Sequence, residues 1–231
     1  MIDWIIDGRD AAHPVTDQGR RRTCLSMAIT GAHEHAVGSS LSSEYLHWAS
    51  GRHPGGYGSP KAATEALRHN GQPPAAQWPY CRAPGASVTG GSPPATVVGP
   101  FARRNSTTRW LGFDEIVDML REDKWPVLGL RVTDAFAARG TGIVVPDGPG
   151  RAGHAVLAVG AAVLRGHGLG PDRDEDTRLL CVRNSWGSAW GWRGHKLITE
   201  TAINDTLITA FALEDGPPSD TGRAPEPCAL N

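Results

Sequence analysis

Several features that would point to a particular partner or compartment are scarce in this 231-residue sequence. Lys+Arg number 23 against 24 for Asp+Glu, so the net charge of −1 creates no field that would attract nucleic acid or an anionic membrane. No apolar run approaches the roughly 20 residues that cross a bilayer, and residues 1–7 lack the basic and long apolar regions of a secretory signal. We therefore expect a cytoplasmic protein that binds neither nucleic acid nor membrane.

Cysteine is also sparse, and its spacing excludes two common uses. The four cysteines never occur as CxxC, which argues against a disulfide scaffold and a zinc ribbon: Cys24, Cys81, Cys181 and Cys228. The stretch His33-Glu34-His35 is the nearest approach to a metal motif, but residues i and i+2 of a helix do not face each other. We expect these side chains to be solvated, and the sequence predicts neither a metal site nor a cofactor.

Helices are predicted in the first half of the chain. Apolar and small residues recur at three- and four-residue steps from Thr23 to Val37, which predicts a largely buried helix with Cys24 in its first turn. Shorter helices are expected at Ser42–Ala49, Lys61–His69 and Phe113–Glu122.

Short segments rich in branched residues dominate the second half. They predict an antiparallel sheet or barrel with strands at Trp125–Val132, Thr141–Val145, His154–Leu164, Leu179–Arg183, Gly194–Ile198 and Thr209–Leu213. Helices followed by strands indicate an α+β fold. We expect a helical lobe over residues 1–111, a β lobe over 112–213, a cleft between the lobes and a mobile proline-rich tail over 214–231.

Four residues carry the chemistry that the sequence suggests. Cys24 opens a helix, where the backbone N–H groups favour a thiolate, and Gln18 precedes it by six residues. His154 lies in Gly-His-Ala-Val and Asn184 in Asn-Ser-Trp-Gly. Each of these residues taken alone is ordinary, because a helix cysteine is usually a small core residue and a strand histidine usually has a structural partner.

Together, the order PVxDQG, Cys, GHAV and NSWGxxWG resembles the papain-like (C1-type) cysteine peptidases from about Asp7 to about Leu213. The resemblance implies a two-lobe α+β fold, with a helical left lobe, an antiparallel β-barrel-like right lobe and the active-site cleft between them. It implies that Cys24 is the nucleophile, His154 the general base and acid, Asn184 the group that orients the imidazole, and Gln18 an oxyanion donor. An N-terminal strand would cross from the first lobe to the second.

The resemblance also assigns supporting and substrate-binding residues. Trp186 would cover the bond between His154 and Asn184, and Trp190 would form the wall on the leaving-group side. Gly55-Gly56-Tyr57 resembles the glycine segment whose backbone pairs with an extended substrate. The implied partner is a peptide or protein substrate.

The chain departs from the family around the nucleophile. Arg21 stands where the family has a bridging cysteine, His53 stands where its partner would be, and Leu25 replaces a tryptophan. Arg22 replaces the glycine that lines the P1 subsite, and Gly153 replaces the common Asp or Asn before the histidine. These two positions are therefore expected to shape substrate binding, and the missing bridge agrees with a reducing compartment.

Other readings remain open at this point. The same triad serves acyltransferases, peptide cyclases and deamidases, and a catalytically silent binding module would keep the fold alone. Asp7 to Gln18 already matches the start of a mature enzyme, so we expect no propeptide and leave open a regulatory partner that restrains activity. Because arginine far outnumbers lysine and Ala, Gly and Pro are abundant, the composition resembles that of a GC-rich bacterium.

Overall fold

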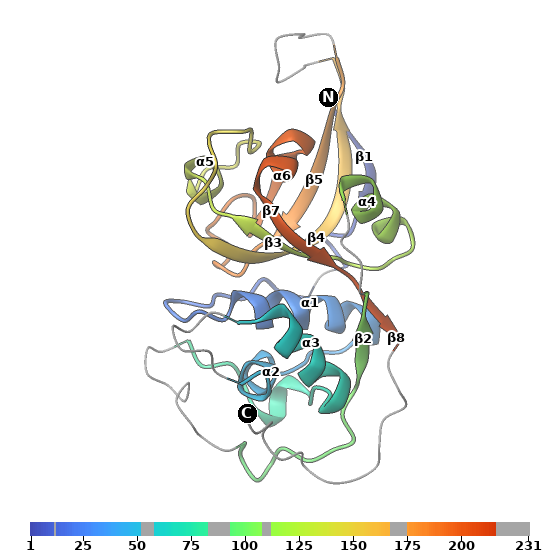
Figure 1. Ribbon diagram of the computed structural model, residues 1–231, viewed down its shortest axis with the longest axis vertical. Coiled ribbons are helices and arrows are strands. Elements are labelled where there is room, and N and C mark those ends of the chain that lie inside the picture. The colour runs from blue at the N-terminus through green and yellow to red at the C-terminus, as the bar shows by residue number, and fades with distance from the viewer. Residues whose placement is uncertain (12, 52–57, 83–92, 108–111, 167–174, 216–231) are drawn as a thin grey trace. The chain divides into compact units, whose positions relative to one another are not determined.

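The computed structural model describes residues 1–11, 13–51, 58–82, 93–107, 112–166 and 175–215 (Figure 1). The chain divides into two compact units: unit 1 is Met1–Asp17 with Thr108–Ala212, and unit 2 is Gln18–Thr107 with Leu213–Asn231. Gly55, Gly56 and Tyr57, together with His53 and most of the expected tail, lie outside the described residues.

The described residues of unit 2 form three α-helices, all of which the sequence predicts. Its elements are α1 (Cys24–Val37), α2 (Ser43–Ala49), α3 (Pro60–His69), a 3-10 turn (Ala75–Gln77), β2 (Arg104–Ser106) and β8 (Leu213–Asp215). The Ser42 hydroxyl caps α2 by accepting from the Tyr45 backbone N–H at 3.0 Å, and Gly38 ends α1 with a left-handed φ of 69°. Strand β8 pairs with β2 and includes Glu214 and Asp215, the first residues of the expected tail.

Aromatic side chains form the centre of unit 2. Tyr45 on α2 is fully buried, and its ring centroid lies 5.3 Å from Phe101, 5.5 Å from Trp48 and 6.4 Å from Trp78. Helix α1 packs against α2 and α3, and its residues are buried without a break from Leu25 to Glu34. The prediction of a buried helix is therefore confirmed.

The expectation of solvated side chains at His33-Glu34-His35 is wrong for the first two residues. His33 is completely buried, and its Nδ1 lies 3.0 Å from Oε1 of Gln72, whose Nε2 donates to the Thr30 hydroxyl at 2.7 Å. Glu34 is buried and accepts from the Leu41 backbone N–H at 3.0 Å. Burial of His33 is possible because Gln72, from a distant loop, supplies a polar partner. The sequence around His33 gives no indication of this partner.

Burial of His33 predicts a loss of stability in acid. Burial lowers the pKa of His33 to about 4, although its bond to Gln72 opposes this shift. Because the unfolded chain binds the proton more readily between pH 6.5 and about 4, stability falls as the pH decreases through that window. For this residue alone we expect a free energy of unfolding about 2 kcal/mol lower at pH 5 than at pH 8.

Urea unfolding at both pH values measures this difference. His33→Gln removes the titrating ring and keeps an amide that can donate to Gln72, so it should reduce the pH dependence. The matched control, His69→Gln, changes an exposed histidine on α3 and should leave the wild-type dependence unaltered. Equal pH dependence in all three proteins would contradict the account of His33.

Unit 1 is built around one antiparallel sheet. Its elements are β1 (Ile2–Asp7), α4 (Phe113–Arg121), β3 (Val127–Arg131), α5 (Asp134–Ala137), β4 (Gly153–Leu164), β5 (Thr177–Arg183), β6 (His195–Thr199), α6 (Glu200–Thr206) and β7 (Leu207–Phe211). The strands follow the order β6-β5-β4-β3-β7, and β1 pairs with the far end of β4. The sequence predicts either an antiparallel sheet or a barrel. Among the described residues the strands form an open antiparallel sheet and do not close into a barrel.

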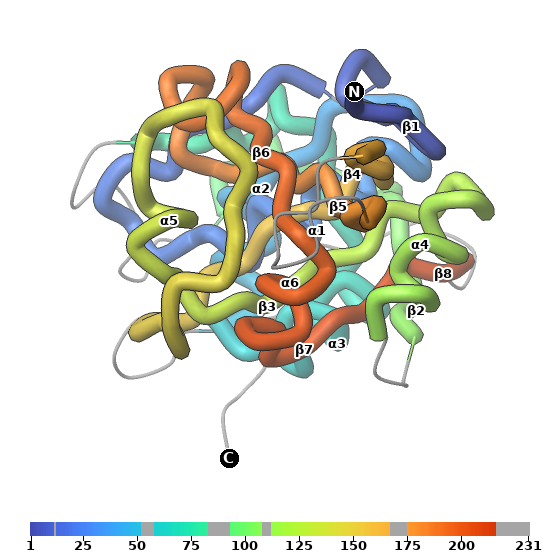
Figure 2. The backbone as a smooth tube through the Cα atoms, turned by 90° about the horizontal axis from the view of Figure 1, so that it is seen from above, coloured from blue at the N-terminus to red at the C-terminus, as the bar shows by residue number. Residues whose placement is uncertain are grey.

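Strand β4 is the centre of this sheet. It is buried without a break from His154 to Ala162, a run without alternation that is typical of a strand covered on both faces. Helices α4 and α6 contact each other and share one face, where α4 packs on β4 and α6 packs on β3, β5 and β6 (Figure 2).

Two local predictions in unit 1 are wrong, and two short helices were missed. The segment Thr141–Val145 forms no strand and pairs only through a single bridge between Val144 and Ile198. The segment Thr209–Leu213 is divided between β7, which belongs to unit 1, and β8, which belongs to unit 2. Helices α5 and α6 were not predicted, because at four and seven residues they are too short to show a helical period.

Candidate active site

Strand pairing explains how two residues 30 positions apart come together. His154 lies at the start of β4 and Asn184 follows the last residue of β5, and these strands run antiparallel with Leu157 opposite Arg183. The start of one strand therefore lies beside the end of the other. Trp186 follows Asn184 by two residues, and its ring also lies beside that of His154.

The hydrogen bond between this pair determines the tautomer of the imidazole. Asn184 Oδ1 lies 2.7 Å from His154 Nε2 and also 2.7 Å from the backbone N–H of Ser185. Since a backbone N–H can only donate, the atom that faces it must be the amide oxygen, and His154 Nε2 must then carry the proton. Nδ1 of the neutral ring is left as the nitrogen that can accept a proton.

Aromatic rings surround this hydrogen bond. The Trp186 ring centroid lies 4.7 Å from that of His154, and Phe136 on α5 meets both rings edge-on at 6.0 and 5.7 Å. His154 is buried, and this burial lowers its pKa although the bond to Asn184 opposes the shift. Unit 1 therefore holds a neutral imidazole near pH 7 in a nearly dry setting, where the bond to Asn184 is strengthened.

One further residue, which the sequence analysis did not single out, holds Phe136 in place. Lys196 on β6 is only 4% exposed, and its ammonium donates to the carbonyls of Ala135, Phe136 and Ala138 at 3.1, 3.2 and 2.5 Å. Burial lowers the pKa of Lys196. In sequence it occupies an ordinary strand position, and only the three-dimensional structure brings the carbonyl groups to it.

Trp190 lies within the same cluster. It is 3% exposed, its indole N–H donates to the Phe136 carbonyl at 3.2 Å, and Lys196 lies over its ring. The observed role of this side chain in unit 1 is therefore support of Phe136. Its contact with a leaving group stays a prediction.

The glycine before the histidine is not required by the fold of unit 1. A Cβ added at Gly153 would meet only the Ile208 side chain, at an ordinary contact distance of 3.6 Å. Gly153 is exposed, so a larger residue would fit there. Its role in substrate binding stays a prediction.

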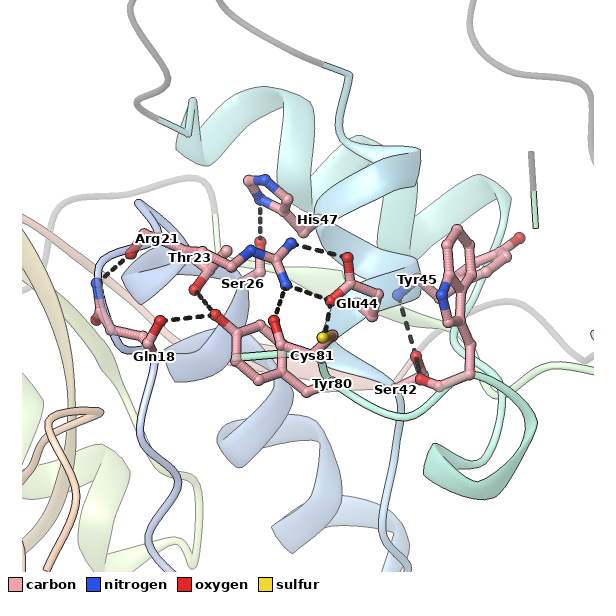
Figure 3. Close-up of polar contacts among 11 residues, drawn as sticks. Gln18, Arg21, Thr23, Ser26, Ser42, Glu44, Tyr45, His47, Tyr80 and Cys81 are labelled. Atoms are coloured by element: carbon pink, nitrogen blue, oxygen red, sulfur yellow. Dashed lines mark hydrogen bonds and ion pairs between the residues drawn. The ribbon is translucent and has the colours of Figure 1, made fainter. Parts of the chain in front are cut away.

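The other predicted catalytic residues lie in unit 2. Cys24 is the first residue of α1 and is half-buried. Gln18 is buried, and its side-chain Nε2 donates to the Arg21 carbonyl at 2.7 Å, while the Tyr80 hydroxyl donates to the Gln18 carbonyl at 2.9 Å (Figure 3). The backbone and the amide of Gln18 are thus both fixed within this unit.

The arginine run of this loop contains a feature that the sequence analysis missed. Arg22 is exposed, as a substrate-binding residue would need to be, but Arg21 is buried and pairs with Glu44 on α2 at 2.6 Å. The signal available in the sequence was the placement of Arg21 where the resemblance implies a bridging cysteine.

The predicted site residues thus fall into two halves, one in each unit. His154, Asn184 and Trp186 form one group in unit 1, and Gln18 and Cys24 share one loop in unit 2. The residue before Gln18, Asp17, pairs with Trp186. The union of these halves in one catalytic centre is part of the proposal below.

The described part of the chain contains no group of three His, Cys, Asp or Glu side chains arranged to hold a metal ion. The three cysteines described, Cys24, Cys81 and Cys181, form no disulfide. No helix among the described residues is both long enough and apolar enough to span a membrane.

Neither family models nor curated proteins match this chain, but solved structures do. Xylellain, a cysteine protease from Xylella fastidiosa, has a TM-score of 0.72 and 16% identity over 94% of this chain and 86% of its own. The chain has a papain-like fold. Bromelain from Ananas comosus (TM-score 0.65, 21% identity, 91% of this chain and 98% of its own) and a Carica candamarcensis cysteine protease (0.68, 22%, 92% and 98%) share it, each in complex with E-64.

These likenesses confirm the α+β papain-like fold that was predicted from the sequence. At identities of 16 to 22%, they establish the fold alone. Activity has to be argued from the side chains.

Proposed function

We propose that this protein is a cysteine peptidase that hydrolyses peptide bonds through an acyl-enzyme on Cys24. The observation that carries the proposal is the 2.7 Å bond between His154 Nε2 and Asn184 Oδ1, which leaves Nδ1 as the proton acceptor. The papain-like fold and the position of Cys24 at the start of α1 support it.

In the proposed acylation step, His154 Nδ1 takes the proton of the Cys24 thiol, and the thiolate attacks the peptide carbonyl carbon. The developing oxyanion accepts from the Gln18 side-chain amide and from the Cys24 backbone N–H. One N–H of Gln18 bonds to the Arg21 carbonyl, and this bond sets the direction of the other. His154 then donates its proton to the leaving amine as the C–N bond breaks.

Deacylation uses the same groups in reverse roles. Water gives a proton to His154 Nδ1 and attacks the thioester carbon, and the carboxylic acid leaves as the thiol is re-formed. Asn184 keeps the ring in one orientation while its charge changes, and Trp186 and Phe136 keep water away from that bond.

Mass analysis of a peptide library incubated with the protein in ¹⁸O-water tests this function. A peptidase gives fragments whose new carboxyl ends carry ¹⁸O. An acyltransferase or peptide cyclase would join fragments without adding water, a deamidase would change side-chain amides and leave chains intact, and a silent binding module would leave the library unchanged. Any of these three results would contradict the proposed hydrolysis.

The proposal places this peptidase in a bacterial cytoplasm. Support comes from Arg21, which forms a buried ion pair at the position where the family has a bridging cysteine. A reducing compartment does not disturb an ion pair, whereas it would open a disulfide.

Replacing Arg22 with glycine should broaden the acceptance of residues at P1. The exposed Arg22 guanidinium lies two residues before Cys24, where it would disfavour Lys and Arg and favour a small or acidic residue. We expect Arg22→Gly to add Lys and Arg to the cleavage profile and to raise the pH at which Cys24 is alkylated.

The control is Arg20→Gly, which removes the same charge from an exposed position in the same loop. It should keep the wild-type profile. A wild-type profile already rich in basic P1 residues, and unchanged in Arg22→Gly, would show that the Arg22 side chain does not face the substrate.

A further inference from the structure

Arg21 is buried between two exposed arginines. Its residue exposure is 6%, whereas Arg20 and Arg22 on either side are exposed. Its guanidinium binds Glu44 through both ends, with NH1 at 2.6 Å from Oε2 and NH2 at 2.8 Å from Oε1. NH1 also donates to the Cys81 carbonyl at 2.5 Å (Figure 3).

This pair joins three separate parts of the chain. Arg21 belongs to the loop between Gln18 and Cys24, Glu44 lies in the first turn of α2, and Cys81 follows the 3-10 turn. Because two nitrogens of the planar guanidinium contact the two carboxylate oxygens of Glu44, the pair fixes both the distance and the orientation of the loop. A contact between two single atoms would fix the distance alone.

Tyr80 extends the network to both ends of the same loop. The Arg21 guanidinium stacks over the Tyr80 ring at 4.7 Å, and the Tyr80 hydroxyl donates to the Gln18 carbonyl at 2.9 Å and lies 2.9 Å from the Thr23 hydroxyl. The side-chain amide of Gln18 in turn donates to the Arg21 carbonyl. The position of the Arg21 carbonyl therefore determines how the Gln18 amide is oriented.

We propose that Arg21, held by Glu44, is a positioning residue that fixes the Gln18 amide for its role as an oxyanion donor. The inference rests on the proposed peptidase function. We call the Arg21–Glu44 pair a non-covalent lock, because it holds the loop between Gln18 and Cys24 in one position. This lock occupies the place where the family has a disulfide, which the sequence analysis expects to be absent from this chain.

A lock of this kind differs from a merely stabilising contact in what its removal changes. Burying two charges has a large desolvation cost, and replacement of such a pair by apolar residues is often neutral or favourable for stability. The double variant Arg21→Met/Glu44→Leu removes both charges together and leaves neither of them buried alone. It should keep the fold and lose the orientation of the loop.

The test compares two reactions of Cys24 in the full-length protein. Hydrolysis of fluorescein-labelled casein passes through an oxyanion, whereas alkylation by iodoacetamide, followed by mass analysis of the Cys24 peptide, does not. For the double variant we expect kcat for casein to fall by about 10- to 100-fold with KM little changed, because one oxyanion donor is misplaced. The rate of alkylation should stay within about twofold of wild type, since it needs only the thiolate.

A double-mutant cycle with Gln18→Ala tests whether the loss of kcat arises through Gln18. If Arg21 acts through Gln18, adding Arg21→Met/Glu44→Leu to Gln18→Ala should cause little further loss. Arg20→Met is the matched control, because it removes the same charge from an exposed neighbour in this loop, and it should retain wild-type kcat. Arg21→Lys keeps the charge without the planar guanidinium, so its kcat should fall nearly as much as that of the double variant Arg21→Met/Glu44→Leu.

Additive losses in the cycle would overturn the inference, as would equal losses of casein hydrolysis and of alkylation. A double variant with wild-type kcat would also overturn it. If thermal melting shows that the double variant is unfolded, Arg21→Lys and Glu44→Gln are compared in the same two reactions, and equal losses in both would again overturn it. If Cys24 of the wild-type protein is alkylated but the protein cleaves no casein, the proposed peptidase function is wrong. The positioning role proposed for Arg21 is then wrong as well.

Discussion

Replacing Cys24 with alanine is expected to reduce peptide hydrolysis by roughly 10⁵-fold or more, because the members of a catalytic triad act as a unit. The fold should survive, since Cys24 is a half-buried first residue of α1 and alanine is the best helix former. Initial rates on fluorescein-labelled casein measure the loss, and thermal melting checks the fold.

The matched control is another thiol that the proposal does not use. Cys181 lies on β5, and burial raises its pKa to about 12, so it stays protonated and unreactive at neutral pH. Cys181→Ala should retain most of the hydrolysis at a temperature below its melting transition. Hydrolysis that survives in Cys24→Ala and disappears in Cys181→Ala would contradict the assignment of the nucleophile.

Loss of His154 should be nearly as damaging as loss of Cys24, and loss of Asn184 should be smaller. His154→Ala removes the only group proposed to move protons, so we expect a fall in kcat of roughly 10⁴-fold or more. Asn184→Ala leaves that group but frees the ring to rotate, since Asn184 Oδ1 is what fixes Nε2. A misplaced base costs roughly 100-fold.

The order of these two effects is the informative result. Rates of casein hydrolysis at pH 7 for both variants, each compared at equal folded fraction, give that order. A larger loss from Asn184→Ala than from His154→Ala would show that Asn184 does more than orient the ring, and the proposed division of roles would then be wrong.

Much of the fold could be predicted because its signals are local. Helix α1 shows a three- and four-residue period over 14 residues, and the buried strand β4 is a continuous apolar run bounded by turns. Helix α5 has only four residues, and its capping by Lys196 comes from a strand about 60 residues later. No local pattern could indicate that contact.

The same distinction applies to the site. Gln18, His154 and Asn184 were predicted because each lies in a motif that can be read in the sequence, and Cys24 because it opens a helix six residues after Gln18. The buried state of Arg21 was missed, because a run of three arginines looks like a solvated loop and its partner Glu44 lies 23 residues away. His33 was misjudged for the same reason, since Gln72 is 39 residues away.

The central claim is that one thiol, Cys24, is activated by His154 for attack on peptide carbonyls. Labelling of the intact protein with E-64, followed by mass analysis of its cysteine peptides and a casein assay on the same sample, tests it most directly. The account predicts one equivalent of label, located on Cys24, with loss of hydrolysis in proportion to labelling and little labelling of His154→Ala under the same conditions. Label on Cys81 with Cys24 unmodified, or full labelling of Cys24 with hydrolysis intact, would contradict it.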